Sequence, residues 1–331
     1  MLLDQSSLAK RECRVGLPPA IQGRAGGTTG PALGTARRAV EGEVTALPLA
    51  STPPPPASLV PSAGSIVPPA RSWIAGGNPT RRSRFAREDF DALSAEQIAV
   101  RLSGSLEERA AFVGAAAEAG VAEAQAVFGQ MLLDGTGVAK DEPAALGWFV
   151  RAAAQHHLMA INMVGRCYDL GWGTAPDKAR AAECYRIAAE RGLDWGMYNY
   201  ATLLALGDGV VEDKVAALDW FGKAAKLGNA KAINFVGSFH EDGWVVQRDM
   251  KKAARLYARA AEGGDFRGAF NHARMLGAAG RVEEAIGWLK RAGAGGTPVF
   301  VDKASAWLEA AEIPAFRKRG VQALRIGAGQ C

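Results

Sequence analysis

A repeat of 36 residues constrains what this 331-residue chain can fold into more than any other feature of its sequence. Small residues recur at this interval, and a glycine, an aspartate and an alanine follow them at fixed distances through four units. The small residues that anchor the units are Gly129, Gly165, Ala201, Gly237 and Ala273. A period of about 20 to 50 residues is typical of solenoids, in which each unit buries its apolar face against its neighbours. The length would allow two ordinary domains, but the repeat favours one elongated domain.

Each unit is predicted to consist of two antiparallel helices. Around the first anchor, Phe128, Met131 and Leu132 have the spacing of one helical face and no strand alternation. A Gly-x-Gly turn follows, as expected where a helix ends with a residue of positive φ; its copies are Gly135–Gly137, Gly171–Gly173 and Gly207–Gly209. An aspartate should then cap the second helix by accepting hydrogen bonds from its free N–H groups; the column is Asp141, Asp177, Asp213 and Asp249.

The full pattern resembles the Sel1-like repeat, a relative of the tetratricopeptide repeat. In the first unit the matching residues are Ala124, Phe128, Gly129, Gly135, Gly137, Val138, Asp141, Ala145, Trp148, Ala152 and Ala153, and three further copies follow. The resemblance covers about 190 of the 331 residues. It implies an all-α fold, a right-handed α-solenoid. A fifth unit departs from the pattern, because its loop at residues 277–281 is four residues shorter, and it looks tetratricopeptide-like.

Five segments are expected along the chain. Residues 1–84 form a Pro/Gly/Arg-rich segment, predicted to be disordered because it cannot bury enough apolar surface. Residues 85–120 should form N-terminal capping helices, with capping boxes beginning at Ser94 and Ser105. Residues 121–264 hold the four repeats, residues 265–312 the short fifth repeat and a C-terminal cap helix, and residues 313–331 a basic tail that should fray.

The N-terminal segment has several possible roles. Arg11, Glu12 and Arg14 interrupt the apolar stretch that a signal peptide would need, so none is predicted. The run of four prolines at residues 53–56 could be a polyproline II ligand, although a spacer is the simpler interpretation. An organelle transit peptide and a translation start later than Met1 remain open alternatives.

Charge is distributed unevenly. Residues 1–87 hold 11 Lys/Arg against 4 Asp/Glu, residues 88–312 hold 24 against 30, and residues 313–331 hold 4 against none. The repeats are therefore mildly acidic, which argues against a nucleic-acid surface on them. The chain lacks the roughly 20 consecutive apolar residues of a membrane span. A cytoplasmic monomer is expected.

The sequence offers no evident catalytic chemistry. A nucleotide-binding Gly-x-Gly follows a strand, whereas here the motif follows a helix and recurs as a turn. His240 and His272 fall in apolar columns of the first helices, and His156–His157 lies at a helix end, which favours a cationic role there. Cys167 and Cys184 are interpreted as reduced core residues, with a redox pair as the alternative. No catalytic residue, metal ligand set, cofactor or small-molecule substrate is predicted.

The candidate site is the concave face of the solenoid. By resemblance to tetratricopeptide arrays, the first helix of each unit lines this face through one stripe of positions. The stripe contains Asn162, Arg166, Trp195, Tyr198, Lys231, Asn234, Arg267, Phe270 and Arg274. Aromatic, arginine and amide side chains together are typical of a peptide-binding groove. The bland alternative is that Trp195 and Tyr198 only pack between neighbouring helices.

The function predicted is that of a non-catalytic scaffold or adaptor that binds a partner protein or an extended peptide. One alternative is a regulator docked to a membrane or to nucleic acid through its basic termini. Another is a hydrolase-like, ligand-processing relative, which would need convergent reactive side chains.

Overall fold

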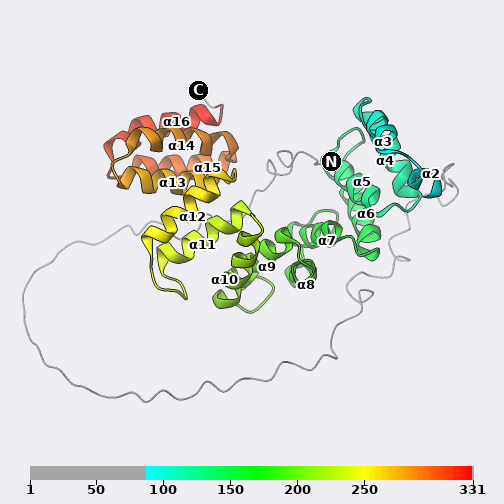
Figure 1. Ribbon diagram of the computed structural model, residues 1–331, viewed down its shortest axis with the longest axis horizontal. Helices are drawn as coiled ribbons and strands as arrows, with labels where there is room; N and C mark the ends of the chain where they lie inside the picture. Colours follow the sequence, from blue (N-terminus) through cyan, green and yellow to red (C-terminus); the bar gives the residue numbers. More distant parts are fainter. Residues whose placement is uncertain (1–86, 330–331) are drawn as a thin grey trace, which may run out of the picture.

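The computed structural model describes residues 87–329, and within this range the secondary structure is helical, with no β-strand. The helices follow one another as an arch in which α7 and α9 lie nearer the opening and α8 and α10 lie on the outer side (Figure 1). The first helices of the five units are α5 (Ala122–Asp134), α7 (Leu158–Leu170), α9 (Asp194–Leu206), α11 (Ala230–Asp242) and α13 (Phe266–Ala278). The second helices are α6 (Glu142–Ala154), α8 (Lys178–Glu190), α10 (Lys214–Lys226), α12 (Met250–Glu262) and α14 (Val282–Gly295). The predicted all-α solenoid is confirmed, and the segment predicted to be disordered lies outside the described residues.

The turn chemistry within each repeat is confirmed. The first glycine of each of the four turns ends its helix in the left-handed region, with φ between 67° and 76° at Gly135, Gly171, Gly207 and Gly243. Each aspartate of the repeat column accepts a hydrogen bond from the N–H three residues further on, at 2.8–2.9 Å. Side-chain capping therefore fixes where the second helix of each of the first four repeats begins, namely α6, α8, α10 and α12.

A small anchor residue sets how closely the two helices of a repeat approach. A Cβ atom built on Gly165 would lie 2.8 Å from the ring of Tyr185, and one on Gly237 would lie 2.7 Å from the ring of Tyr257. Both rings are fully buried. Atoms this close repel strongly, so a larger anchor would push the two helices apart and open the core.

Two kinds of repeat alternate along the array, so the structural period is 72 residues. In the first, third and fifth units a tryptophan of the second helix meets a ring of the first helix edge to face, at centroid distances of 5.3–6.0 Å. These pairs are Phe128–Trp148, Tyr200–Trp220 and His272–Trp288. In the second and fourth units Cys184 and Leu256 occupy the tryptophan position.

The second and fourth units instead carry a buried tyrosine with a carboxylate partner. Tyr185 donates a hydrogen bond to Asp169 at 3.1 Å, and Tyr257 donates one to Glu241 at 2.6 Å. Asp169 and Glu241 lie 72 residues apart, as do the two tyrosines. The array is thus built from pairs of repeats.

The two ends of the array are capped by further helices. At the N-terminal end stand α2 (Arg87–Asp91), α3 (Ala95–Leu102) and α4 (Leu106–Glu118), and both predicted capping boxes are present, at Ser94 and Ser105. At the C-terminal end stand α15 (Pro298–Glu309), a π-helical turn η3 (Phe316–Gly320) and α16 (Val321–Gly327).

The prediction of a frayed basic tail is wrong for residues 316–327. Phe316 and Leu324 are fully buried, and Arg319 forms a two-bonded ion pair with Glu283 of α14 at 2.8 and 2.6 Å. Gly293 and Gly327 allow α14 and α16 to pack backbone against backbone. The apolar residues of the tail have helical spacing and pack on α14. This burial stabilises the helix despite the positive charge of the tail.

The helix C-terminal role predicted for His156–His157 is wrong for His157. His157 is the N-cap of α7, where its Nδ1 accepts a hydrogen bond from the N–H of Ala160 at 3.1 Å. Its Nε2 lies 2.8 Å from a carboxylate oxygen of Glu123 in the preceding unit. His156 is the residue with positive φ, 64°, that separates α6 from α7, so the cap falls on the next residue.

We expect Asp213→Ala to lower the free energy of unfolding by about 1 kcal/mol, because the N–H of Ala216 loses its capping oxygen. Chemical denaturation followed by circular dichroism measures the change. Asp213→Ser is the control, since serine can accept the same hydrogen bond, and it should retain most of the stability. Equal losses in both variants would show that the carboxylate acts through another contact.

Candidate functional site

The structure separates the nine predicted site residues by accessibility. Asn162, Tyr198, Asn234 and Phe270 are buried, with exposed fractions of 1–6%. Arg166, Trp195, Lys231, Arg267 and Arg274 are partly exposed. A partner can therefore contact the second group directly, whereas the first group supports the surface from below.

The two buried asparagines join neighbouring units. The amide oxygen of Asn162 accepts a hydrogen bond from Asn199 at 2.9 Å, and that of Asn234 accepts one from Asn271, also at 2.9 Å. Each pair connects a first helix to the next first helix, 37 residues along the chain. A hydrogen bond between buried amides holds the two helices in one register, because a shift would leave both groups unpaired.

Buried rings also account for two of the predicted aromatic residues. Tyr198 packs against Phe221 and Phe235, and Phe270 lies against Phe300 and Trp307. Burial raises the pKa of Tyr198 to about 12. Tyr198 therefore packs between neighbouring helices, which is the alternative to a role in the groove.

One column of the repeat places three accessible side chains on successive first helices. Trp195, Lys231 and Arg267 stand 36 residues apart, on α9, α11 and α13. The ammonium of Lys231 lies 5.0 Å from the centre of the Trp195 ring, and the guanidinium of Arg267 lies 4.5 Å from that of Phe266. Cations stacked on rings are held in place and partly stripped of water. We name Trp195, Lys231 and Arg267 the inner column.

A buried carboxylate lies beneath the inner column. Asp265 is the N-cap of α13, and its Oδ2 accepts a hydrogen bond from the N–H of Gly268 at 2.7 Å. Its Oδ1 is buried without a hydrogen-bond partner. Burial raises the pKa of Asp265, while the charges of Arg267 and Lys231 oppose that rise.

Lys231 itself is strongly affected by its surroundings. Burial lowers its pKa from the ordinary 10.5 to about 8, although the charge of Asp265 acts in the opposite direction. A lysine in this state carries a charge that water stabilises poorly.

The remaining two arginines have different surroundings. Arg274 makes two hydrogen bonds to the carboxylate of Glu241, at 3.1 and 3.0 Å, so its charge is neutralised within the fold. Arg166 lies 4.8 Å from the ring centre of Trp172, and burial lowers its pKa. Arg166 therefore adds a cation on α7 to the inner column. Arg274 instead stabilises the fold through its ion pair with Glu241.

Other candidate chemistry is accounted for by packing. Cys167 and Cys184 are buried free thiols, and burial raises the pKa of each to about 12, which makes them poor nucleophiles. His240 is buried, and His272 packs edge to face against Trp288. Residues 87–329 contain no cluster of three or more His, Cys, Asp or Glu side chains arranged for a metal. Among the helices of that same range, none combines the length and hydropathy needed to cross a bilayer.

Sequence reasoning missed three residues that shape this surface: Asp265, Asn199 and Asn271. The N-cap column varies from unit to unit, through Val121, His157, Leu193, Asn229 and Asp265. A comparison that looks for the same residue in every repeat does not detect a position that varies in this way. A search at 72 residues would have paired Asn162 with Asn234 and Asn199 with Asn271.

A family model described as Sel1 repeat matches residues 122–157, 158–193, 196–229 and 230–265. A Sel1 repeat protein from Oxalobacter formigenes superimposes with a TM-score of 0.58 at 27% identity, over 72% of this chain and 96% of that one. A protective antigen with an SLR fold from uropathogenic Escherichia coli superimposes with a TM-score of 0.53 at 26% identity. The match covers 71% of this chain and 52% of that one. Residues 122–265 thus match four consecutive copies of the Sel1 repeat model.

Two curated relatives share part of the array. An exopolysaccharide production negative regulator of Rhizobium meliloti is 31% identical over 133 residues, 35% of this chain and 50% of the relative. A chitin synthase regulator of Saccharomyces cerevisiae is 29% identical over 133 residues, 39% of this chain and 19% of the relative. The chain therefore spans half or less of the length of these curated relatives.

We expect Lys231→Met to raise the free energy of unfolding at pH 7 by on the order of 1 kcal/mol, because a poorly solvated charge is removed. Between its folded pKa of about 8 and the ordinary 10.5, the unfolded wild type binds more protons, so wild-type stability rises with pH. The variant should lack that rise. Denaturation at several pH values measures it, with exposed Lys226→Met as the control; identical pH profiles for wild type and Lys231→Met would contradict the assignment.

Proposed function

We propose that this array of Sel1 repeats is a non-catalytic scaffold that binds an extended, acidic segment of a partner protein along its inner face. The observation that carries the proposal is the inner column, in which a tryptophan and two cations stand on three successive helices. Arginine and tryptophan are enriched among residues that dominate binding energies at interfaces. A segment that runs across the helices would meet these side chains one after another.

The charge of this surface favours an acidic segment. Arg166, Lys231 and Arg267 are partly exposed, while the carboxylates nearby are committed to the fold. Glu241 binds Arg274, and Asp265 is buried as a helix cap. A carboxylate of the partner could accept hydrogen bonds from either arginine.

The support below the column is suited to recognition. The asparagine pairs and the rings of Tyr198 and Phe235 fix the relative positions of the helices that carry the column. A surface held in its binding conformation loses little conformational freedom on association. Selectivity would then come from the order of tryptophan, lysine and arginine along the groove.

The curated relatives are both named as regulators, which is consistent with a protein that acts by holding another. Under this proposal the present chain regulates a partner by occupying or positioning one of its segments. The identity of the partner rests on chemistry alone: an exposed, extended stretch with carboxylates and at least one apolar residue for Trp195.

The proposal is tested by capture of partner proteins from an extract of the source organism. The full chain is immobilised as wild type and as Lys231→Gln/Arg267→Gln, and bound proteins are quantified by mass spectrometry. A groove partner should be retained about tenfold less by the variant, because two desolvated cationic contacts are lost.

Lys290→Gln/Lys303→Gln is the matched control, since it removes two exposed lysines from α14 and α15. Circular dichroism establishes that all three proteins are equally helical. Partners retained equally by the wild type and the inner-column variant would exclude the inner face as the binding surface.

A further inference from the structure

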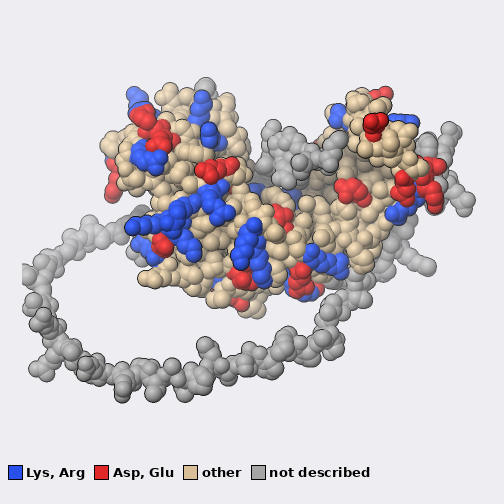
Figure 2. All heavy atoms as spheres, in the orientation of Figure 1, with Lys and Arg blue, Asp and Glu red and all other residues tan. Residues whose placement is uncertain are grey.

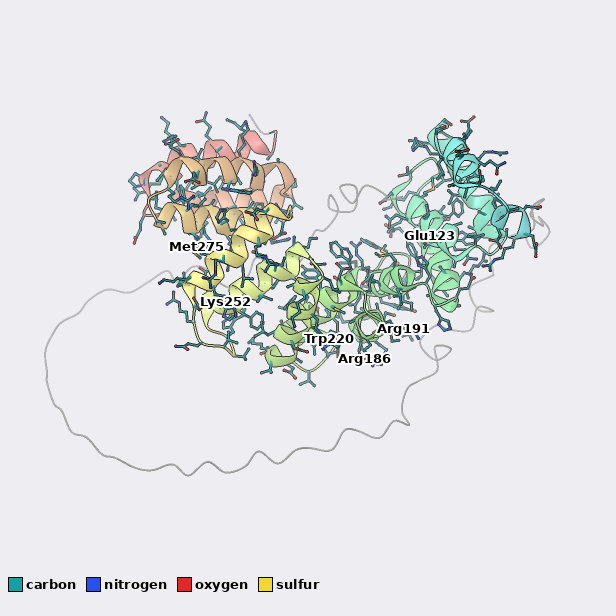
Figure 3. All side chains as sticks on the ribbon, in the orientation of Figure 1. Glu123, Arg186, Arg191, Trp220, Lys252 and Met275 are labelled. Atoms are coloured by element: carbon teal, nitrogen blue, oxygen red, sulfur yellow. The ribbon has the colours of Figure 1, made fainter. Side chains whose placement is uncertain are left out.

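The outer face of α12 carries an unusual concentration of positive charge. Lys251, Lys252, Arg255 and Arg259 are all exposed, and within residues 87–329 none of them forms an ion pair. At 100° per residue the four side chains fall within one 100° sector of the helix. Figure 2 shows Lys and Arg side chains gathered over this helix, and Figure 3 places Lys252 on the side of the arch away from its opening.

This stripe is specific to the fourth repeat. The corresponding residues of α10 are Val215, Ala216, Asp219 and Lys223, and those of α8 are Ala179, Arg180, Glu183 and Ile187. The packing of a second helix therefore does not require cations at these positions. Arg248, just before α12, adds a fifth exposed cation at the same end.

Exposed aliphatic side chains lie beside the stripe, at the loop end of the third and fourth repeats. Their exposed fractions range from 39% to 88%, and they are Leu206, Val211, Val215, Val245 and Met250. The two loops are neighbours, because the ammonium of Lys214, at the start of α10, lies 5.9 Å from the ring centre of Trp244 in the next loop. Figure 1 shows the loop between α11 and α12 projecting from the arch. Clustered exposed apolar residues mark surfaces that bind something.

Val245 is held in a strained conformation that exposes it. Its φ is +50°, in the left-handed region that a β-branched residue strongly disfavours. The preceding repeats have Gly137, Gly173 and Gly209 at this position. Glycine would satisfy the turn without strain, so the fold gains nothing from the valine. Strain of this kind points to a role for the side chain outside the fold.

We propose that this corner of the array docks on the surface of an anionic phospholipid membrane. We define the docking corner as Lys251, Lys252 and Arg255 together with Val211, Val215 and Val245. The cations would bind lipid headgroups, and the aliphatic side chains of the loops would enter the boundary between headgroups and acyl chains. The large apolar residues that are exposed at this corner include no aromatic ring, which favours lipid over single-stranded nucleic acid, whose bases stack on rings.

The proposal does not depend on the inner face, because the docking corner is on the outer side. A scaffold docked by its outer side would keep its groove open to a partner. Loss of vesicle binding and loss of partner capture can therefore be observed separately.

Sedimentation of the full chain with vesicles tests the proposal. We expect binding to phosphatidylcholine vesicles that contain phosphatidylserine, weakened by added salt, and little binding to phosphatidylcholine alone. Lys251→Glu/Arg255→Glu should reduce binding about tenfold, and Val215→Asp should reduce it about fivefold. Val245→Gly should weaken binding while raising the midpoint of thermal unfolding, an opposition that a purely structural role would not produce.

Each variant has a matched control. Lys290→Glu/Lys303→Glu reverses two exposed charges elsewhere, and Val299→Asp changes an exposed valine in the first turn of α15, as Val215→Asp does in α10. Both controls should bind like the wild type. Wild-type binding by the docking-corner variants would overturn the proposal and assign any vesicle binding to other cations, such as the ten in residues 1–86. Binding to duplex DNA or self-association without vesicle binding would overturn it as well.

Discussion

The close contact between a small anchor residue and a buried ring is the constraint on which the rest of the array depends. Where Gly165 meets Tyr185 and Gly237 meets Tyr257, the tyrosine ring of the second helix packs directly against the glycine of the first. That contact fixes the angle and distance of each helical pair, and the stacking of pairs then generates the arch. The inner column and the docking corner both inherit their geometry from it, since neither is held together by its own contacts alone.

The sequence alone was sufficient to predict the architecture, because the residues that determine it are the same in successive repeats. Turn glycines, capping aspartates and small anchors recur since each solves the same local problem in every unit. The tail was predicted wrongly because it occurs once. Its apolar residues are few, and the positive charge of Arg317, Lys318 and Arg319 obscured the helical spacing of Phe316 and Leu324.

The surface could be predicted only in part, because its members differ from unit to unit. The stripe rule located Trp195, Lys231 and Arg267 correctly on first helices, but it could not distinguish accessible residues from buried ones such as Asn162 and Phe270. That distinction depends on how far each helix is covered by the next. Nor could the sequence show that Asp265 is buried with an unpaired oxygen, since an aspartate at a helix start is ordinarily exposed.

The alternation of two repeat types limits how such an array can change in length. Each asparagine pair joins an even unit to the following odd one, while at the next junction Phe221 stacks on Phe235 at 4.8 Å. Loss or duplication of a single repeat would place two like units side by side and leave amides facing rings. Recombination between units 36 residues apart would therefore yield mismatched junctions, whereas exchange in steps of 72 residues would keep asparagine opposite asparagine. The gene for such an array can be expected to grow or shrink by pairs.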